Sequence, residues 1–258
     1  MGRAIALGIV RADVVSSTSL RIADRHPVMS NALVADLPGA VATDAATACA
    51  GADLVLVCVK PKDVAPLLAD LAAHDVLAHH PLLVSIAAGV SIASLESATL
   101  GAVPVVRAMP NTPCVIGKGH TVLARGTRAT DEHLARAHAI FSSIGRSLTL
   151  DEKHLDAVTA VSASGPAFIY VIIEALADGG VSCGLPRAVV TEMVAQMTLG
   201  AAAMVLAGDR HPAALKDDVT TPGGCTIAGL MALEDGKIRS VIARAVETTT
   251  RVASGLGG

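Results

Sequence analysis

Aromatic residues are almost absent from this sequence, which has no Trp, one Tyr and two Phe among 258 residues. Aromatic rings supply the surfaces on which proteins stack bases and sugars, so stacking is not expected as a binding mode. The apolar 52% of the chain is dominated by Ala, Val and Leu. Such small side chains let helices approach closely, which suits a helical bundle or a dimer interface.

Clustered charge is also missing. The net charge is -3 at pH 7, and the 20 basic residues are scattered along the chain. A protein that follows a phosphate backbone needs a concentrated basic surface, so nucleic acid is not expected as a partner. The high apolar content places the chain among folded globular proteins rather than disordered ones.

Long apolar runs, secretory signals and cysteine pairs are lacking as well. The longest charge-free runs, residues 157–173 and 193–208, are shorter than the roughly 20 apolar residues of a spanning helix, so no membrane segment is expected. The sequence does not start with the basic-then-apolar layout of a secretory signal. The five cysteines are odd in number and include no Cys-x-x-Cys pair. We therefore expect a protein of the reducing cytoplasm.

Motifs of metal and triad chemistry are absent too. The nine histidines form no His-x-x-x-His on a predicted helix, and no Gly-x-Ser-x-Gly occurs. No metal site is expected.

What is present is a regular alternation in the first half of the chain. Strands are predicted at residues 20–23, 53–59, 82–87, 105–108, 121–124 and 147–150. Residues 54–59 are apolar at every position, which predicts a strand buried on both faces. Between the last two strands, Thr130 or Asp131 can cap a helix. This pattern is typical of a doubly wound parallel sheet that binds a dinucleotide.

After residue 151 the strand signals end and helical periodicity continues. Helices are predicted at residues 166–177, at 187–207 and from about 238 onward. We expect a dinucleotide-binding domain at residues 1–150 and an all-helical domain at 151–258, joined by a short connection.

The cofactor candidates lie where the predicted sheet would bind a ligand, at the carboxyl ends of its strands. Gly2 would be the third glycine of a Gly-x-Gly-x-x-Gly fingerprint, with a plain N-terminal helix as the alternative. Asp24 and Arg25 follow the first strand, where an acid binds the ribose hydroxyls and an arginine accepts a 2′-phosphate. Arg25 favours NADPH, with NADH as the alternative; both side chains could also be merely solvated.

Three further strand exits have small or Pro-containing turns. They are Val59-Lys60-Pro61, Ala87-Ala88-Gly89, and Arg107 to Pro113, which includes Asn111. The alternative is that each proline only ends its strand and that Lys60 is solvated.

Two segments stand out in the helical half. Residues 162–167 read as a helix start with Pro near the first helical position, which a capping role explains. Residues 220–226 place two glycines before a helix, so that backbone N–H groups can bind a carboxylate.

Taken in order, these segments resemble the pyrroline-5-carboxylate reductase family, and the likeness runs from Met1 to about Leu256. In the helical half it rests on residues 156–167, 174–181, 184–187, 211–212, 215–217, 222–229 and 233–234. In the cofactor half it rests on residues 59–61, 87–89 and 109–113.

The resemblance implies an oxidoreductase that reduces 1-pyrroline-5-carboxylate to L-proline with NADPH or NADH, the last step of proline biosynthesis. It implies a homodimer made through the helical domain, which can assemble further into a ring. The resemblance implies Thr159 and Ser164 as catalytic residues, with the Thr159 hydroxyl near the imine nitrogen. The implied substrate-binding residues are Gly165, Pro166, Gly223, Gly224, Cys225 and Thr226. The cofactor-binding residues that we predict are Gly2, Asp24, Arg25, Val59, Lys60, Pro61, Ala88, Asn111 and Asp218.

The sequence departs from the family pattern at several positions. Ala163 replaces a glycine, which is tolerable if its backbone is not left-handed. Cys225 stands where another small residue is common, and Ala45 replaces a side chain that would bind the cofactor. Asp218 adds a carboxylate that should weaken the binding of an anion.

The family's first strand and Gly-x-Gly are not in the sequence, and a start codon placed too late would explain this. A polypeptide that begins at Met1 is expected to have poor cofactor affinity and a destabilised N-terminal domain.

Two other readings remain open. One is a related imine, ketimine or β-hydroxyacid reductase, for which Lys216 would be the catalytic lysine. The other is an oligomeric scaffold without catalysis that has lost cofactor binding.

Overall fold

The computed structural model describes residues 1–255, so the last three residues of the predicted helical domain lie outside the described residues. Contacts divide the chain into two compact units. The first unit contains Met1–Ser164 together with the described residues from Thr248 onward, and the second contains Gly165–Glu247. An α/β unit and a helical unit are therefore both present, which confirms the predicted fold class.

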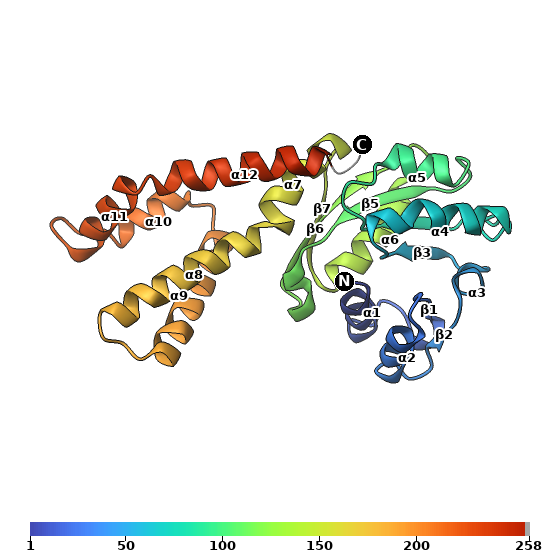
Figure 1. The fold of residues 1–258 in the computed structure, drawn as a ribbon, viewed down its shortest axis with the longest axis horizontal. Coiled ribbons are helices and arrows are strands. Elements are labelled where there is room, and N and C mark those ends of the chain that lie inside the picture. Colours follow the sequence, from blue (N-terminus) through green and yellow to red (C-terminus); the bar gives the residue numbers. More distant parts are fainter. Residues whose placement is uncertain (256–258) are drawn as a thin grey trace. The chain divides into compact units, whose positions relative to one another are not determined.

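The first unit contains a five-stranded sheet in the order β3-β4-β5-β6-β7 (Figure 1). The strands are β3 (Leu54–Val57), β4 (Leu82–Ser85), β5 (Val105–Met109), β6 (Gly119–Arg125) and β7 (Gly145–Thr149). All neighbouring strands are parallel except the antiparallel pair β5 and β6. A second, two-stranded parallel sheet pairs β1 (Arg21–Ile22) with β2 (Val41–Ala42). The sequence predicted every strand except β2.

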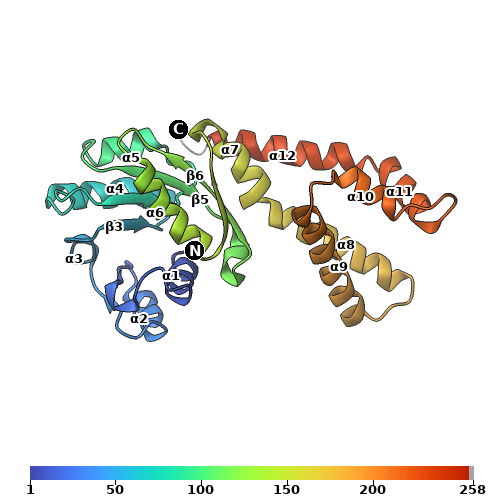
Figure 2. The same cartoon turned by 180° about the vertical axis from the view of Figure 1, so that it is seen from behind.

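Helices cover both faces of the five-stranded sheet, as the two opposite views show (Figures 1 and 2). One face carries α4 (Pro61–Ala73) and α5 (Ile92–Ala98), and the other carries α1 (Gly2–Arg11) and α6 (Asp131–Ser142). The consecutive residues Leu82, Leu83 and Val84 of β4 are all buried because their side chains enter opposite helical layers. The Thr130 side chain caps α6, as predicted.

The prediction that residues 54–59 are buried on both faces was wrong for β3. Val55 and Val57 are buried, but Leu54 and Leu56 are only half-buried. Within the described residues β3 has β4 as its sole strand neighbour and lies at the sheet's edge. A continuous apolar run does not reveal whether a strand is central or at an edge.

Shorter elements connect the larger ones in this unit. They are η1 (Ser17–Ser19), α2 (Pro27–Ala35), α3 (Ala45–Cys49), η2 (Thr112–Ile116), η3 (Glu152–His154), α7 (Leu155–Val158) and a π-helical turn at Thr159–Ala163, here called the π turn.

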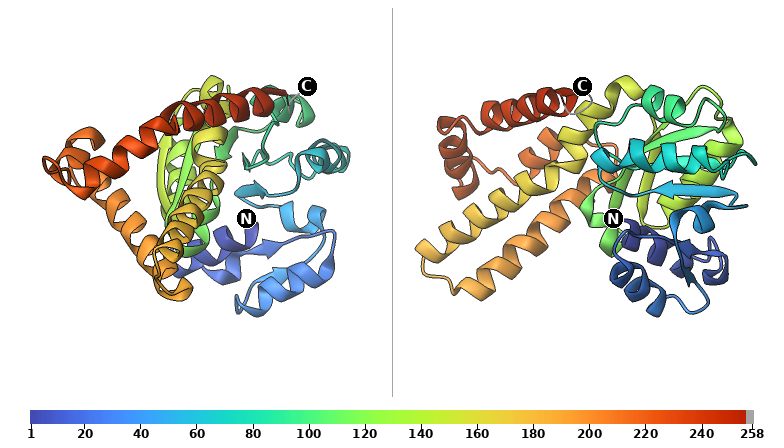
Figure 3. Two further views of the ribbon diagram at one scale, coloured as in Figure 1. Left: turned by 60° about the vertical axis from the view of Figure 1, so that its left-hand side comes forward. Right: turned by 45° about the vertical axis from the view of Figure 1, so that its right-hand side comes forward.

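The second unit is helical and begins with a long helical hairpin, α8 (Gly165–Ser182) and α9 (Arg187–Ala207), seen side by side in Figure 3. Ala177 packs on Val190 and Val194 between the two helices. A Cβ on Gly180 would lie 2.3 Å from Val190 Cγ2, so glycine permits this close approach. The bounds of α9 are those predicted, whereas α8 runs five residues further than the predicted end at 177.

Three more helices follow: α10 (Pro212–Asp218), α11 (Cys225–Asp235) and α12 (Ile238–Ser254), of which the part from Thr248 onward belongs to the first unit. The predicted start of the last helix at about residue 238 is confirmed.

Two helical stretches of the described chain are long and apolar enough to cross a membrane by length and composition alone. They are Glu152–Ser182 and Arg187–Ala207, and little of either is buried within the chain. This is weak evidence for a membrane protein, because core helices of soluble proteins can have the same length and composition. This differs from the expectation that no such segment exists, because the helices extend beyond the charge-free runs at residues 157–173 and 193–208.

Candidate functional site

Three predicted cofactor segments follow adjacent parallel strands of the first unit. Lys60 is the N-cap of α4 and Pro61 its first residue, which confirms the sharp exit predicted after β3. Ala88 follows β4, and Asn111 follows β5. Because β3, β4 and β5 are parallel neighbours, their carboxyl ends lie at one edge of the sheet. This is the edge at which open α/β sheets bind ligands.

Gly2 begins α1 close to the exit of β3. A Cβ on Gly2 would lie 3.1 Å from Cys58 Cβ, so a larger residue would push the helix start away from the strand. Met1, the N-cap, offers no side-chain oxygen to the first amides of this ten-residue helix. These amides are therefore available to an anion.

Asp24 and Arg25 are exposed but have partners. Asp24 Oδ1 accepts a hydrogen bond from the His26 backbone N–H at 2.8 Å. Arg25 Nη1 lies 3.4 Å from both carboxylate oxygens of Asp63, in the first turn of α4. The arginine is thus held near the start of α4 while its side chain stays 64% exposed.

Asn111 connects the exit of β5 with two other segments. Its Oδ1 accepts from the His120 backbone N–H at 2.9 Å, and its Nδ2 donates to the carbonyl and the hydroxyl of Ser162, both at 3.3 Å. The predicted cofactor residue Asn111 is therefore joined to the π turn that leads to Ser164.

Residues 162–167 contain the start of α8 at Gly165, as predicted, and the π turn lies directly before it. The Ser164 backbone N–H donates to the Thr159 carbonyl, five residues earlier, at 2.8 Å. Pro166 is the second residue of α8, a position where its missing N–H costs no intrahelical hydrogen bond. Ala163 lies within this turn and has no left-handed backbone, so its replacement of glycine introduces no strain.

Thr159 is partly buried in the π turn. Its hydroxyl donates to the Leu155 carbonyl at 2.8 Å. Because the hydroxyl donates its proton to this hydrogen bond, the Thr159 oxygen can act only as an acceptor toward a further partner.

In the second unit, the predicted carboxylate turn lies between α10 and α11. Gly223 has a φ of +67°, which favours glycine. A Cβ on Gly224 would lie 2.4 Å from Thr221 Oγ1, and the Gly224 N–H donates to the Thr221 carbonyl at 3.0 Å. Gly224 is the N-cap of α11 and has no side chain to occupy the first amides, which belong to Cys225 and Thr226. The turn thus presents open N–H groups at a helix start, the arrangement that binds carboxylates. Gly165 and Pro166 begin α8 in the same unit.

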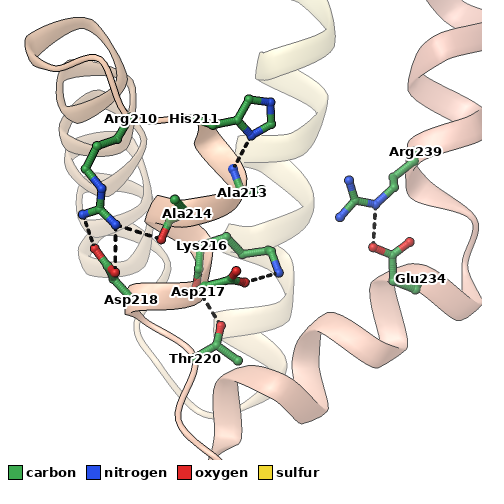
Figure 4. A network of polar contacts seen from close by, with 10 residues as sticks. All are labelled: Arg210, His211, Ala213, Ala214, Lys216, Asp217, Asp218, Thr220, Glu234 and Arg239. Carbon is green, nitrogen blue, oxygen red and sulfur yellow. Dashed lines mark hydrogen bonds and ion pairs between the residues drawn. The ribbon is translucent and has the colours of Figure 1, made fainter.

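Asp218 ends α10 and is paired with Arg210 (Figure 4). The two guanidinium nitrogens Nη1 and Nη2 contact the carboxylate at 2.5 and 3.0 Å. Hydrogen bonding to Arg210 lowers the pKa of Asp218, and the same contact raises the pKa of Arg210. The carboxylate that was expected to weaken anion binding is therefore neutralised by its neighbour. Lys216, the candidate lysine of the alternative reading, has its Nζ 2.7 Å from Asp217 Oδ1.

A cavity of about 370 Å³ lies elsewhere in the first unit, along α1. It is lined by one side of this helix, by η2 and by Ser143 and Ile144 after α6. None of the predicted site residues lines it.

The structure shows contacts of polar residues that the sequence named only as members of longer segments. Arg107 is only 4% exposed in the middle of β5, and it pairs with Glu152. Ser162 and Thr221 support the two predicted segments through the contacts given above. The one sign of these contacts in the sequence was a charged residue, Arg107, inside the apolar run of β5.

Comparison with known proteins agrees with both units. A family model described as pyrroline-5-carboxylate reductase dimerisation matches residues 152–256, and one described as NADP oxidoreductase, coenzyme F420-dependent, matches residues 1–89. The chain is 38% identical over 257 residues to the pyrroline-5-carboxylate reductase of Synechocystis sp., covering 100% of this chain and 95% of that one. It is 51% identical over 176 residues to the enzyme of that name from Schizosaccharomyces pombe, covering 68% of this chain and 62% of the relative. The solved structure of Plasmodium falciparum pyrroline carboxylate reductase with NADP bound matches with a TM-score of 0.88 and 29% identity, covering 100% of this chain and 95% of that chain.

Proposed function

Since the chain belongs to the pyrroline-5-carboxylate reductase family, we propose that it reduces 1-pyrroline-5-carboxylate to L-proline with NADPH as the preferred donor. The observation that carries this proposal is the turn at Gly223 and Gly224, whose open amides suit the substrate carboxylate. The relative with NADP bound and the position of Arg25 near the start of α4 support NADPH over NADH.

The reaction needs positioned groups more than a strong acid or base. Bound NADPH supplies a hydride to the carbon of the protonated C=N bond, whose electron pair then moves to nitrogen. The amides of Cys225 and Thr226, with the Thr226 hydroxyl, hold the carboxylate. The Thr159 oxygen accepts a hydrogen bond from the imine N–H, because its own proton is donated to Leu155. Holding the two reactants in a productive orientation supplies much of the rate enhancement.

The cofactor is held by the first unit in this proposal. The first amides of α1, beginning at Gly2, bind the pyrophosphate, and Asp24 and Arg25 bind the ribose and its 2′-phosphate. The strand exits around Lys60, Ala88 and Asn111 line the remainder of the dinucleotide. Ser164, Gly165 and Pro166 line the substrate pocket.

The assembly proposed is a homodimer made through the helical domain, able to form a ring of dimers, in the cytoplasm. The match of residues 152–256 to a dimerisation model supports it. Exposed apolar side chains on α9, among them Met193, Met197 and Met204, would be buried by a second copy rather than by a membrane.

The test is an assay of the purified protein. NADPH absorbance should fall on addition of 1-pyrroline-5-carboxylate, with L-proline formed in equal amount. NADPH oxidation without proline, or no oxidation by folded protein, would contradict the proposal.

A further inference from the structure

A charged side chain lies buried in the centre of the five-stranded sheet. Arg107 pairs in register with Ser85 of β4 and Ala124 of β6, and its side chain is 5% exposed. Its Nη1 donates to Glu152 Oε1 at 2.9 Å. Its Nε and Nη2 are buried without a partner among the described residues, so Glu152 is the one carboxylate that compensates the charge. Removing such a partner leaves the buried guanidinium charge uncompensated, which strongly destabilises the folded state.

Glu152 joins three elements through one oxygen. The same Oε1 that contacts Arg107 also accepts from the backbone N–H of Ile92, at the start of α5, at 2.7 Å. The carboxylate thus fixes η3, where it resides, to β5 and to α5.

The chain that follows Glu152 carries the proposed catalytic hydroxyl. Leu155 is fully buried, and its carbonyl accepts a hydrogen bond from the Thr159 hydroxyl. Three residues after Thr159, Ser162 is held by Asn111. Arg107 and Asn111 therefore hold the helical segment at two points, and Thr159 lies between them.

We infer that Arg107 and Glu152 are positioning residues for the reduction, because their ion pair fixes the segment that presents the Thr159 oxygen. This inference rests on the proposed function. Neither side chain need touch substrate or cofactor, and a displacement of about 1 Å at a reacting group can cost a hundredfold in rate.

The experiment compares Glu152→Ala and Glu152→Gln with the control Arg125→Met. The control breaks an ion pair of the same unit, Arg125 with Asp131 at 2.7 Å, whose side chains are 50% and 96% exposed. We expect Glu152→Ala to lower kcat by about tenfold to a hundredfold, with the KM for NADPH unchanged. Glu152→Gln keeps an oxygen acceptor, so its kcat should fall less. Arg125→Met should match the parent protein.

A second readout does not need turnover. The Ser164 N–H closes the π turn on the Thr159 carbonyl, so its hydrogen exchange should be faster in Glu152→Ala and unchanged in Arg125→Met. An unaltered kcat in folded Glu152→Ala, or an unaltered exchange rate at Ser164, would overturn the inference. If Glu152→Ala fails to fold, Glu152→Gln decides by the same two criteria. Absence of turnover in the parent protein would contradict the proposed function instead. The exchange rates at Ser164 would still show whether the ion pair fixes the π turn.

Discussion

Thr159 is the residue on which the proposed chemistry depends most closely. Its hydroxyl proton is donated to the Leu155 carbonyl, so the oxygen can accept from a protonated imine. We expect Thr159→Val to lower kcat by about a hundredfold, within the range seen when a positioned catalytic group is removed. Thr159→Ser retains the hydroxyl and should stay near the parent rate. Steady-state kinetics of the two variants check this, and full turnover by Thr159→Val would rule out the role.

The buried thiol of Cys58 makes the free energy of unfolding depend on pH in the alkaline range. Burial raises the pKa of its thiol from 9.0 to about 12. The folded state therefore keeps a proton that the unfolded chain releases, and the resulting stability is fully present below pH 9.0 and lost as pH rises toward about 12. We expect the free energy of unfolding in urea to fall above pH 9.0, and to fall less in Cys58→Ala. Equal slopes for the two proteins would contradict this assignment.

Single-residue predictions from sequence succeeded where a local pattern determines the position. Lys60 and Pro61 were predicted at a strand exit, and they cap and begin α4. Arg107 and Glu152 were missed as a pair because 45 residues separate them, and side-chain spacing carries no information about contacts at that distance.

At the scale of elements, the turn before α11 depends on the absence of a side chain at Gly224. A Cβ there would lie 2.4 Å from Thr221 Oγ1 and 3.2 Å from the Thr221 carbonyl oxygen. Overpacking of this kind costs about 1–3 kcal/mol. We expect Gly224→Ala to raise the KM for the substrate by about tenfold, the factor that corresponds to about 1.4 kcal/mol.

The double variant Thr221→Ala/Gly224→Ala is the control for this prediction. It removes the nearer oxygen, so the KM should return part of the way to the parent value. A substrate KM that Gly224→Ala leaves unchanged would show that the turn does not bind the carboxylate.

Helix α10 carries a second element-scale prediction, drawn from the contacts in Figure 4. The pKa of Asp218 is lowered from 3.8 by the hydrogen bonds of Arg210, so the carboxylate is charged at neutral pH. The stability that this shift contributes is present above pH 3.8 and is lost as pH falls through the lowered pKa of the folded state. Arg210→Ala would leave this negative charge uncompensated and should raise the KM for the anionic substrate, most strongly at low ionic strength.

Its control is Arg210→Ala/Asp218→Ala, which removes both charges and should restore the KM. Kinetics at low and high salt measure both variants. If Arg210→Ala has the parent KM at low salt, Asp218 lies too far from the substrate to affect it.

Sequence patterns predicted long periodic elements well and irregular ones poorly. The bounds of α9 agree with prediction, and Pro186 and Gly208 flank this helix of 21 residues. The helix start within residues 162–167 was predicted from Ser, Gly and Pro, but the π turn at Thr159–Ala163 before it was not, because no residue type marks a widened turn. Within the candidate site, the glycine turn was identifiable from its residues, whereas the hydrogen bond from Asn111 to Ser162 was not, because 51 residues separate the two.

At the scale of the whole molecule, the helical unit exposes several large apolar side chains on α9. Met197 on α9 is 51% exposed and Met193 is 55% exposed. We expect Met197→Glu to shift the proposed dimer toward monomer, because a buried carboxylate without a partner is costly at an interface. Val28 on α2 is 78% exposed, so Val28→Glu adds the same charge to the first unit as a matched control.

Sedimentation velocity over a range of concentrations measures the effect on assembly. Unchanged dimer mass in Met197→Glu would place the interface away from this part of α9. Recovery of the parent protein in the membrane fraction, rather than in the soluble one, would instead favour the spanning role that the length of these helices allows.

The proposed reaction transfers one hydride from the nicotinamide to the substrate carbon. Deuterium in place of the transferred hydrogen makes this step measurable. The protein would be incubated with 1-pyrroline-5-carboxylate and NADPH that carries deuterium at the transferred position of nicotinamide C4. The account predicts L-proline with one deuterium at C5, detected by mass spectrometry. Proline without deuterium, or no proline from folded protein, would contradict it.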